Sequence, residues 1–293
     1  MRFGHRRRGD GGLTLFAERD GRRLDVPGEV VLDDLLEDPE SLPRVLSEVD
    51  EAFDRGDGNL LDPAAALAPP LAAPGKVIAI GLNYYDHCRE FGVEPPTAPV
   101  VFAKFPSSMC GHREEVRWDA EVTSRVDWEV ELGVIIGRRA RNLTEERALD
   151  AVFGYTVIND VTARDIQEAE SQWVRAKSLD TFCPVGPVVV SADEVLDPHA
   201  LVLRSRVNRN VMQESNTSLM IFGVPELVAR LSASTTLEPG DMIATGTPLG
   251  VGAFRSPPLF LQDGDVMDME IEGLGTLTNA CRVENGRTKG ETA

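Results

Sequence analysis

The chain has 293 residues, of which 42% are hydrophobic and 27% charged, as is ordinary for a soluble globular protein with one large domain, alone or with a small appendage. Its formal net charge of −18 argues against nucleic acid or an anionic membrane surface as a partner, because both would repel it. No apolar run approaches membrane-spanning length and the four scattered cysteines form no CxxC pair, so we expect a cytoplasmic protein with reduced thiols.

The first 74 residues differ in pattern from the rest of the chain. Short strands are predicted over 13–17 and 29–32, and residues 33–53 carry Leu, Val and Ala at helical spacing among many acids. This mixture predicts a small N-terminal α/β domain, including a linker, over residues 1–74.

Two segments of this N-terminal part are expected to lie outside regular secondary structure. The three consecutive arginines at 6–8 are interpreted as part of a frayed basic leader. The stretch 63–74, rich in Ala, Pro and Leu, is predicted to be a semi-rigid linker into the main domain.

Short strands broken by Gly and Pro dominate residues 75–286. Val77–Ile80 is predicted to be a strand that runs into Gly81, and a helix is predicted to carry Tyr84–Phe91. Further strands are predicted over 155–159, 188–190, 201–203, 241–245 and 266–272, and helices near 144–152, 164–174 and 226–232. These patterns predict a mostly β (α+β) main domain without alternating βαβ units, followed by a tail over 287–293.

The segment Val126–Gly137 is the most informative in the chain, because it reads as a strand that carries carboxylates on one face. Side chains two residues apart on a strand share a face, so Glu129 and Glu131 point the same way, with Asp127 beside them. The opposite, core-facing side carries Trp128, Val130 and Leu132. Crowded carboxylates repel one another unless a cation neutralises them, which favours a hard divalent ion. The alternative is a solvated strand edge with ordinary surface acids.

A third acid, Asp160, follows directly after the predicted strand that ends at Asn159. Two carboxylates from one strand and one from another would provide half of an octahedron and leave positions open for water or substrate. Mg²⁺ and Mn²⁺ sites commonly have this form. The alternative is that Asp160 caps the turn that follows it.

His87 and Glu90 are three residues apart in a predicted helix, so both side chains lie on one face. Glu90 would orient the imidazole and raise its basicity, and such a pair is able to deprotonate a water molecule. The alternative is a partly exposed surface pair with no catalytic role.

Lys177 and Arg164 are candidates for holding a carboxylate or a developing oxyanion, because both lie near predicted helix ends in the main domain. Surface salt bridges are the alternative. The Gly-rich turn at 244–252 would let the backbone approach a ligand, but it lacks both the P-loop ending and a dinucleotide fingerprint. The chain also contains no GxSxG elbow and no HExxH pair, so serine hydrolase and zinc protease activities are not supported.

Together these segments resemble the fumarylacetoacetate hydrolase family from about residue 76 to 284. The resemblance is carried by five motifs in order, at 81–87, 126–132, 159–165, 177–184 and 246–252. Residues 254–261 are similar to the subgroup linked to oxaloacetate tautomerisation. One departure is Asn208–Asn210, where the family usually has a tight Asn-Gly turn, and another lies at Met109–His112.

The resemblance implies a mixed β-roll or sandwich domain with a small N-terminal α/β domain, usually in a homodimer. It implies that Glu129, Glu131 and Asp160 bind one Mg²⁺ or Mn²⁺ ion per subunit. His87 and Glu90 would form the water-activating dyad. The positions that hold the substrate or stabilise its oxyanion would be Arg164, Gln167, Lys177 and Thr247.

The implied substrate is a small 2-oxo acid, chelated by the metal through its carboxylate and 2-oxo oxygen and converted through a metal-stabilised enolate. Hydrolysis of a C–C bond in an acylpyruvate-like 1,3-diketo acid is the main prediction, because His87 and Glu90 are both present. The alternatives are oxaloacetate decarboxylation and keto–enol tautomerisation or isomerisation, as for 2-hydroxyhepta-2,4-diene-1,7-dioate. A protein that binds a metal and an organic acid without turnover is the non-enzyme alternative.

Overall fold

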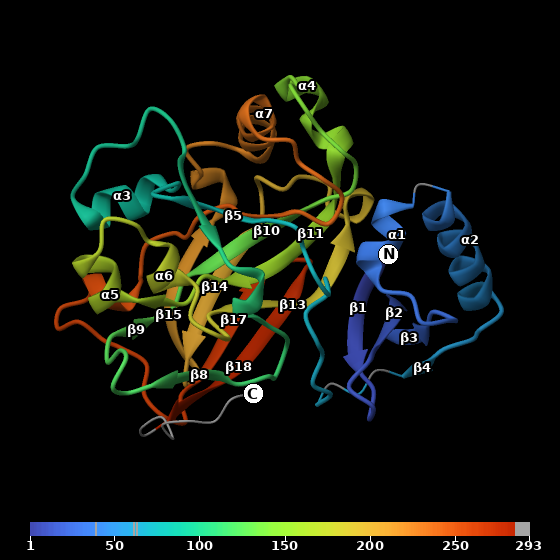
Figure 1. Cartoon of the computed structure of the whole chain (residues 1–293), viewed down its shortest axis with the longest axis horizontal. Helices are drawn as coiled ribbons and strands as arrows, with labels where there is room; N and C mark the ends of the chain where they lie inside the picture. Colours follow the sequence, from blue (N-terminus) through green and yellow to red (C-terminus); the bar gives the residue numbers. More distant parts are fainter. Residues whose placement is uncertain (39, 61, 63, 285–293) are drawn as a thin grey trace.

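The computed structural model describes residues 1–38, 40–60, 62 and 64–284, and in these the chain forms a sheet-rich α+β fold (Figure 1). This confirms the predicted fold class. The predicted tail at 287–293 and the predicted domain end at 286 lie outside the described residues. None of the helices in the described part combines the length and hydropathy that a membrane-spanning segment needs.

The larger sheet runs from the N-terminal strands to the candidate site. Its order is β4 (Asn59–Leu60), β3 (Arg22–Asp25), β2 (Leu13–Arg19), β1 (Arg2–Arg7), β13 (Cys183–Ser191), β11 (Val152–Asn159), β10 (Val130–Ile136), β16 (Met242–Ala244), β5 (Val77–Gly81) and β6 (Val100–Lys104), with β7 (Met109–Cys110) paired to β13. Most neighbours are antiparallel, whereas β16 is parallel to β5 and β7 is parallel to β13.

A second sheet packs on the middle of the first. Its order is β15 (Asn210–Asn216), β14 (Val202–Val207), β17 (Val266–Ile271), β18 (Gly275–Glu284) and β8 (Val116–Asp119). The contacts run between β10, β11 and β13 of the first sheet and β14, β17 and β18 of the second. The turn at Asn208–Arg209 joins β14 to β15 as a two-residue hairpin, with φ values of 50° and 69°. The departure noted there therefore still builds a hairpin.

Helices cover the edges and ends of these sheets (Figure 1). They are α1 (Leu32–Glu37), α2 (Ser41–Asp54), α3 (Tyr85–Phe91), α4 (Glu145–Ala148), α5 (Arg164–Ala169), α6 (Val174–Lys177) and α7 (Val224–Ser234), with 3₁₀ turns η1 (Pro106–Ser108), η2 (Leu149–Ala151), η3 (Ala192–Glu194), η4 (Thr217–Leu219) and η5 (Gly252–Phe254). The helix predicted near 144–152 is thus α4 followed by a 3₁₀ turn. The helix predicted over 164–174 is α5, which ends at Ala169, and α6 begins only at Val174. Thr144 stands at the N-cap of α4 without a side-chain cap hydrogen bond.

Strand β10 is buried on both faces because the larger sheet lies between two hydrophobic clusters. Leu132 and Val134 pack into the cluster shared with the second sheet. Ile135 packs into the other cluster, which contains Phe3 and Leu35 from the N-terminal part. Burial on both faces explains why this strand reads as a nearly continuous apolar run after Glu131.

The N-terminal strands extend the larger sheet. Arg2 and Phe3 of β1 pair with β13 on one side, and β1 pairs along its whole length with β2 on the other. The interpretation of 6–8 as a frayed leader is therefore wrong for Arg6 and Arg7, which belong to β1. The prediction of a strand over 29–32 is also wrong, because Leu32 begins α1 and lies on the buried face of that helix.

Part of the predicted linker is packed against the rest of the molecule. Leu67, Ala68 and Leu71 are buried, and the Ala68 amide donates a hydrogen bond to the His5 carbonyl over 3.0 Å. This part of the predicted linker is therefore packed against neighbouring segments of the chain. The division of the chain at 74/75 into two domains stays a prediction.

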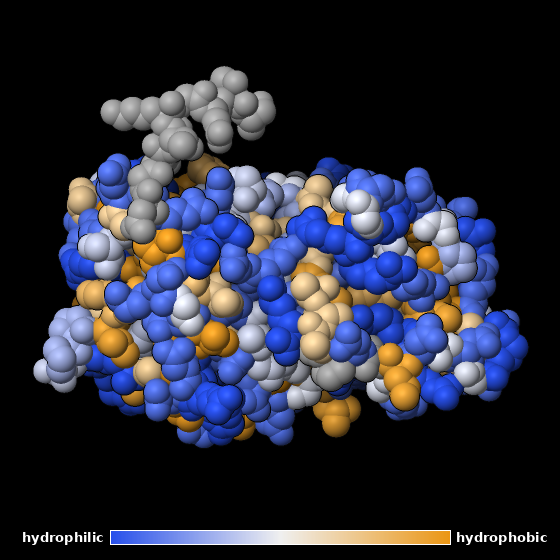
Figure 2. All heavy atoms as spheres, turned by 90° about the horizontal axis from the view of Figure 1, so that it is seen from below, coloured by the Kyte–Doolittle hydropathy of each residue, from blue (hydrophilic) through white to orange (hydrophobic). Residues whose placement is uncertain are grey.

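One face of the molecule is largely polar (Figure 2). Figure 2 shows one face covered mostly by hydrophilic residues, with hydrophobic residues in small separate patches. All four cysteines are buried and unpaired.

Candidate active site

The candidate site lies at a gap between two antiparallel strand pairs. β9 (Val126–Asp127) pairs with β12 (Thr162–Ala163), and β10 pairs with β11. The strand predicted over 126–137 is therefore broken at Trp128 and Glu129, opposite Asp160. The Asp160 amide donates to the Glu129 carbonyl over 2.9 Å across this gap. Strand pairing thus sets Glu129 and Asp160 side by side although they are far apart in the sequence.

Three carboxylates converge at this gap. One oxygen each from Glu129, Glu131 and Asp160 lies within 4.8 Å of the others, and the residues are 5%, 1% and 0% exposed. The odd-numbered acids share a face, as the alternation predicts, while Trp128 and Val130 pack in the core behind them. The alternative of a solvated edge is excluded by this burial.

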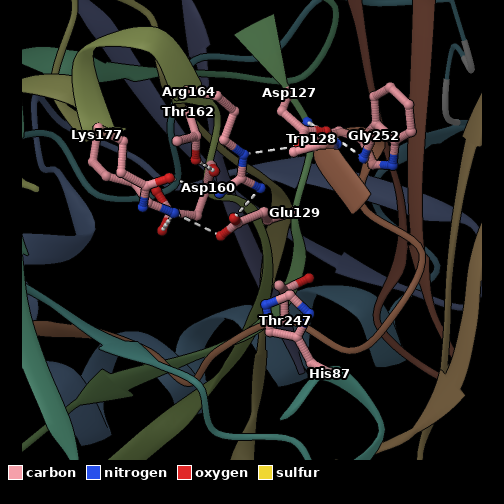
Figure 3. Close-up of polar contacts among 12 residues, drawn as sticks. His87, Asp127, Trp128, Glu129, Asp160, Thr162, Arg164, Lys177, Thr247 and Gly252 are labelled. Carbon is pink, nitrogen blue, oxygen red and sulfur yellow. Dashed lines mark hydrogen bonds and ion pairs between the residues drawn. The ribbon is translucent and has the colours of Figure 1, made fainter. Parts of the chain in front are cut away.

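Two buried cations hold Glu129 from one side (Figure 3). The Lys177 ammonium donates to Glu129 Oε2 over 2.6 Å and to Asp160 Oδ2 over 2.8 Å. The Arg164 guanidinium donates to Glu129 Oε1 over 2.6 Å. Burial favours neutral Glu129, but the attraction of Lys177 and Arg164 outweighs it and lowers the pKa of Glu129 to about 2.

A third cation, Lys104, was missed by the sequence reasoning. It lies at the end of β6, is 1% exposed, and donates to Asp160 Oδ1 over 2.6 Å. Its ammonium also contacts the carbonyl of Lys177. The only signal in the sequence was a lysine that closes an apolar strand. Because both oxygens of Asp160 accept from lysines, that carboxylate does not cap the turn after it.

Glu131 differs from the other carboxylates because no lysine or arginine side chain pairs with it among the described residues. Its Oε2 accepts a hydrogen bond from the Gly246 amide over 2.8 Å. Burial raises the pKa of Glu131 well above its ordinary value, and the nearby Asp160 and Glu129 charges raise it further. A buried carboxyl of this kind, beside two other carboxyl groups, fits a divalent cation that would take the place of its proton.

Asp127 lies outside the triad and has a positioning role. Its Oδ2 accepts from Arg164 Nε over 2.8 Å, and its Oδ1 accepts from the Gly252 amide over 2.7 Å. Burial favours neutral Arg164, but Asp127 and Glu129 outweigh it and raise the pKa of the guanidinium, which stays charged. Asp127 therefore fixes Arg164 and ties the loop after residue 250 to the site.

Helix α3 brings His87 to the same site. His87 Nδ1 and Glu90 Oε2 are 3.0 Å apart, as the three-residue spacing predicts, and Glu90 Oε1 accepts from the Gly250 amide over 2.8 Å. His87 is only 6% exposed, so it is not a surface histidine. In Figure 3, His87 and Thr247 lie across the site from the residues that hold Glu129.

The remaining predicted residues are already engaged in hydrogen bonds. Thr247 Oγ1 donates to the Val130 carbonyl over 3.0 Å and accepts from Gln213 Nε2 over 2.8 Å. Gln167 Oε1 accepts from Arg164 Nη1 over 2.9 Å. These contacts fix their orientation toward the cavity.

A cavity of about 460 Å³ joins these groups. Of the predicted site residues, those that line it are His87, Glu129, Glu131, Arg164, Gln167, Lys177 and Thr247. Glu90 and Asp160 stand behind this lining as partners of His87 and Lys177. The structure therefore brings all nine predicted residues together: seven line the cavity, and the other two are hydrogen-bonded to residues that line it.

Comparison with known proteins relates the chain to one family. The family model described as "Fumarylacetoacetate (FAA) hydrolase C-terminal" matches residues 76–282. Oxaloacetate tautomerase fahd2, mitochondrial, of Xenopus laevis is 48% identical over 216 residues, which are 73% of this chain and 67% of that protein. Oxaloacetate tautomerase YisK of Bacillus subtilis (strain 168) is 47% identical over 216 residues, 73% of this chain and 72% of that protein.

Two solved structures are similar over nearly the whole chain. A fumarylacetoacetate hydrolase from Exiguobacterium antarcticum has a TM-score of 0.83 at 38% identity, covering 97% of this chain and 100% of that one. A maleylpyruvate hydrolase from Sphingobium sp. SYK-6, described in complex with manganese(II) ion and pyruvate, has a TM-score of 0.80 at 30% identity, covering 98% and 100%.

Proposed function

The chain belongs to the fumarylacetoacetate hydrolase family and is a metal-dependent enzyme of that family, and from this premise we propose that it catalyses the keto–enol tautomerisation of oxaloacetate. The observation that carries the proposal is the 48% and 47% identity to two relatives named oxaloacetate tautomerases. The buried carboxylate triad and the His87–Glu90 pair supply the chemistry. This preference reverses the sequence-based order, in which tautomerisation was an alternative to C–C hydrolysis.

Glu129, Glu131 and Asp160 would hold the metal, which we propose to be Mg²⁺ or Mn²⁺. Three buried carboxylate oxygens from two neighbouring segments of the backbone are the donor set that these hard ions prefer. The similar maleylpyruvate hydrolase is described with manganese(II), which supports the choice. A divalent cation bound there supplies positive charge that stabilises the negative charge on the substrate when C3 is deprotonated.

His87 is the proposed base and acid for the proton at C3. When Nδ1 donates its proton to Glu90, Nε2 carries a lone pair and is free to accept a proton from the substrate. Tautomerisation moves one proton from C3 to the 2-oxo oxygen, or back, and needs no nucleophile. Glu90 stabilises the imidazolium that forms between the two transfers.

Lys177 and Arg164 are proposed to hold the acid group of the substrate. An ammonium has three N–H donors, and two of those on Lys177 are used by Glu129 and Asp160. One donor remains for a substrate carboxylate or for the oxygen on which charge develops. Burial favours neutral Lys177, but Asp160 and Glu129 outweigh it and raise its pKa, so Lys177 stays charged.

The test measures the rate at which the enol absorbance of oxaloacetate decays, first with the Mn²⁺-loaded enzyme and then after EDTA is added. Pyruvate release is followed in parallel. We expect acceleration that EDTA abolishes, without an equal yield of pyruvate. A rate equal to that of buffer would contradict the proposal.

C–C hydrolysis of an acylpyruvate-like acid is the second candidate. It is favoured by the His87–Glu90 pair, which is also suited to activating water, and by the 30% identity to a maleylpyruvate hydrolase. Oxaloacetate decarboxylation is a third outcome of the same site. Acetylpyruvate cleavage faster than oxaloacetate tautomerisation would bring hydrolysis back to first place, and stoichiometric pyruvate from oxaloacetate would indicate decarboxylation.

We also propose that the protein forms a homodimer. We propose further that it binds a small 2-oxo acid and neither nucleic acid nor a membrane. The net charge of −18 supports the exclusion of polyanions. A mass of one chain, 31.9 kDa, by light scattering would contradict the dimer. Residence in the cytoplasm stays a prediction, and the relative from Xenopus laevis is named a mitochondrial protein.

A further inference from the structure

The cavity is lined by two kinds of side chain. Carboxylates, Lys177 and Arg164 form its polar lining, and four aromatic rings line it as well. We name these rings the aromatic lining: Phe91, Phe102, Trp173 and Phe254. The proposed tautomerisation uses none of them.

Phe102 and Trp173 form the half of the aromatic lining that adjoins Lys177. Their ring centroids are 5.4 Å apart at an interplanar angle of 75°, and the Lys177 ammonium lies 5.4 Å from the centroid of Phe102. A Cβ atom on Gly81 would come within 2.6 Å of Trp173 Cζ3. The glycine at the end of β5 therefore leaves the space that the indole ring occupies.

Phe91 and Phe254 form the half that adjoins His87. Their centroids are 4.8 Å apart in an edge-to-face arrangement, and the Phe254 centroid is 5.9 Å from that of His87. Phe91 is 48% exposed and Phe254 is 38% exposed. Two large apolar rings that remain this exposed at a cavity wall would gain from being covered by an apolar ligand group.

The charges place the polar part of a ligand away from these rings. Both cations that line the cavity, Arg164 and Lys177, are bound to the carboxylates of the triad. The other lining acid, Glu168, pairs with Arg125. No lysine or arginine among the cavity-lining residues stands apart from the triad to pair with a second substrate carboxylate beside the aromatic lining.

The size of the cavity points in the same direction. Cavities of roughly 300–1,000 Å³ usually hold drug-sized molecules. The cavity here has about 460 Å³, whereas oxaloacetate is a four-carbon acid. The cavity is therefore larger than a four-carbon acid needs, and the aromatic lining, with Ile80, Leu82 and Ala253, forms the apolar part of its wall.

We propose that the aromatic lining binds an apolar substituent on C3, so that the enzyme accepts 2-oxo acids with an alkyl or aryl group there, such as phenylpyruvate. The inference rests on the proposed function, because the 2-oxo acid group is taken to bind at the triad beside His87. The reaction is balanced: the C3–H bond breaks, an O–H bond forms on the 2-oxo oxygen, and the C2=O double bond becomes a C2=C3 double bond, or the reverse. The Phe91–Phe254 pair contacts the substituent because it adjoins the proposed base for C3.

The experiment measures dissociation constants of pyruvate and phenylpyruvate for the Mn²⁺-loaded enzyme by calorimetry. Both ligands carry the same 2-oxo acid group, so their affinity ratio reports the substituent alone. We expect phenylpyruvate to bind at least about 10-fold more tightly. Trp173→Ala and Phe254→Ala should each lower this ratio several-fold. The matched control is Phe105→Ala, which removes a 53% exposed ring outside the cavity and should leave the ratio unchanged.

Equal affinity for the two ligands would overturn the inference, as would an equal loss of the ratio in Phe105→Ala. If Trp173→Ala does not fold, Phe254→Ala provides the same measurement at a more exposed ring. Turnover of oxaloacetate without preference for phenylpyruvate would refute this inference alone. Preference for phenylpyruvate without turnover of oxaloacetate would refute the proposed function and leave the aromatic lining as a binding site.

Discussion

At the scale of single residues, the site depends on which carboxylate lacks a cationic partner. Glu129 and Asp160 are each held by two buried cations, whereas the recorded hydrogen bond to Glu131 comes from a backbone amide. The pKa of Glu129 is accordingly lowered to about 2, while burial raises that of Glu131. Two acids that are only two residues apart thus have pKa values shifted in opposite directions, and Glu131 is the residue whose proton a metal would displace.

Glu131→Gln should stabilise the metal-free protein at neutral pH and abolish Mn²⁺ binding. The pKa of Glu131 is higher in the folded protein than in the unfolded chain, where it is about 4.5. The contribution of Glu131 to folding stability is therefore fully present below the unfolded pKa and is lost as the pH rises through the folded pKa. Melting temperatures in EDTA and in MnCl₂, from pH 5 to pH 8, are the measurement. Glu168→Gln, at a paired acid in the cavity wall, is the control. A full Mn²⁺-induced increase in the Glu131 variant would contradict the ligand assignment.

Lys104→Met should lower the free energy of unfolding by about 3 kcal/mol, because it leaves a fully buried carboxylate oxygen of Asp160 without its cation. Urea denaturation of the metal-free protein is the measurement. Arg139→Met breaks an ion pair whose arginine side chain is 73% exposed and should cause little change. Similar losses in both variants would mean that Lys104 is not specifically coupled to Asp160.

At the scale of elements, α3 is positioned by contacts made at both ends of the helix. Asn83, just before it, donates to the carbonyls of Phe222 and Thr245. Within the helix, Asp86 Oδ2 accepts from Ser215 Oγ over 2.6 Å, and Glu90 accepts from the Gly250 amide. The helix therefore presents His87 to the triad by contacts with three other segments.

His87→Ala should lower kcat for oxaloacetate tautomerisation by about 100-fold or more, the usual contribution of a positioned acid–base group. The Kd for Mn²⁺ should stay nearly unchanged, because His87 is outside the triad. Arg89→Ala, at an exposed position of the same helix, is the matched control for rate and affinity. Equal turnover by the His87 variant and the parent would remove the dyad from the mechanism.

At the scale of the whole molecule, the proposed substrate is an anion, whereas the chain itself has a net charge of −18. The cations of the site are buried and neutralised by carboxylates, so the long-range field that a dianion meets is negative. Folding does not remove this repulsion, and only the surrounding salt screens it.

Raising the ionic strength from about 10 to 150 mM should therefore increase kcat/KM for oxaloacetate, because the Debye length falls from roughly 30 to 8 Å over this range. The effect on a monoanion such as pyruvate, measured as inhibition, should be smaller. A kcat/KM that falls with added salt would indicate a locally positive approach to the cavity.

The features that depend on local periodicity could be predicted from the amino-acid sequence. Alternation placed Glu129 and Glu131 on one face, and three-residue spacing placed His87 beside Glu90, because strand and helix geometry act over a few residues. The family resemblance, carried by motifs in order, was likewise available without coordinates and is confirmed.

Only the tertiary structure decided which groups meet across long separations. Lys104 reaches Asp160 from 56 residues away, and β1 joins β13, because sheet pairing and packing bring together segments whose partners no local pattern records. The same reason explains why the basic N-terminus is an ordered strand and why Glu131 alone of the three acids has no cationic partner among the described residues. Local periodicity determines the direction in which a side chain points, whereas its neighbours and therefore its charge state depend on the assembled fold.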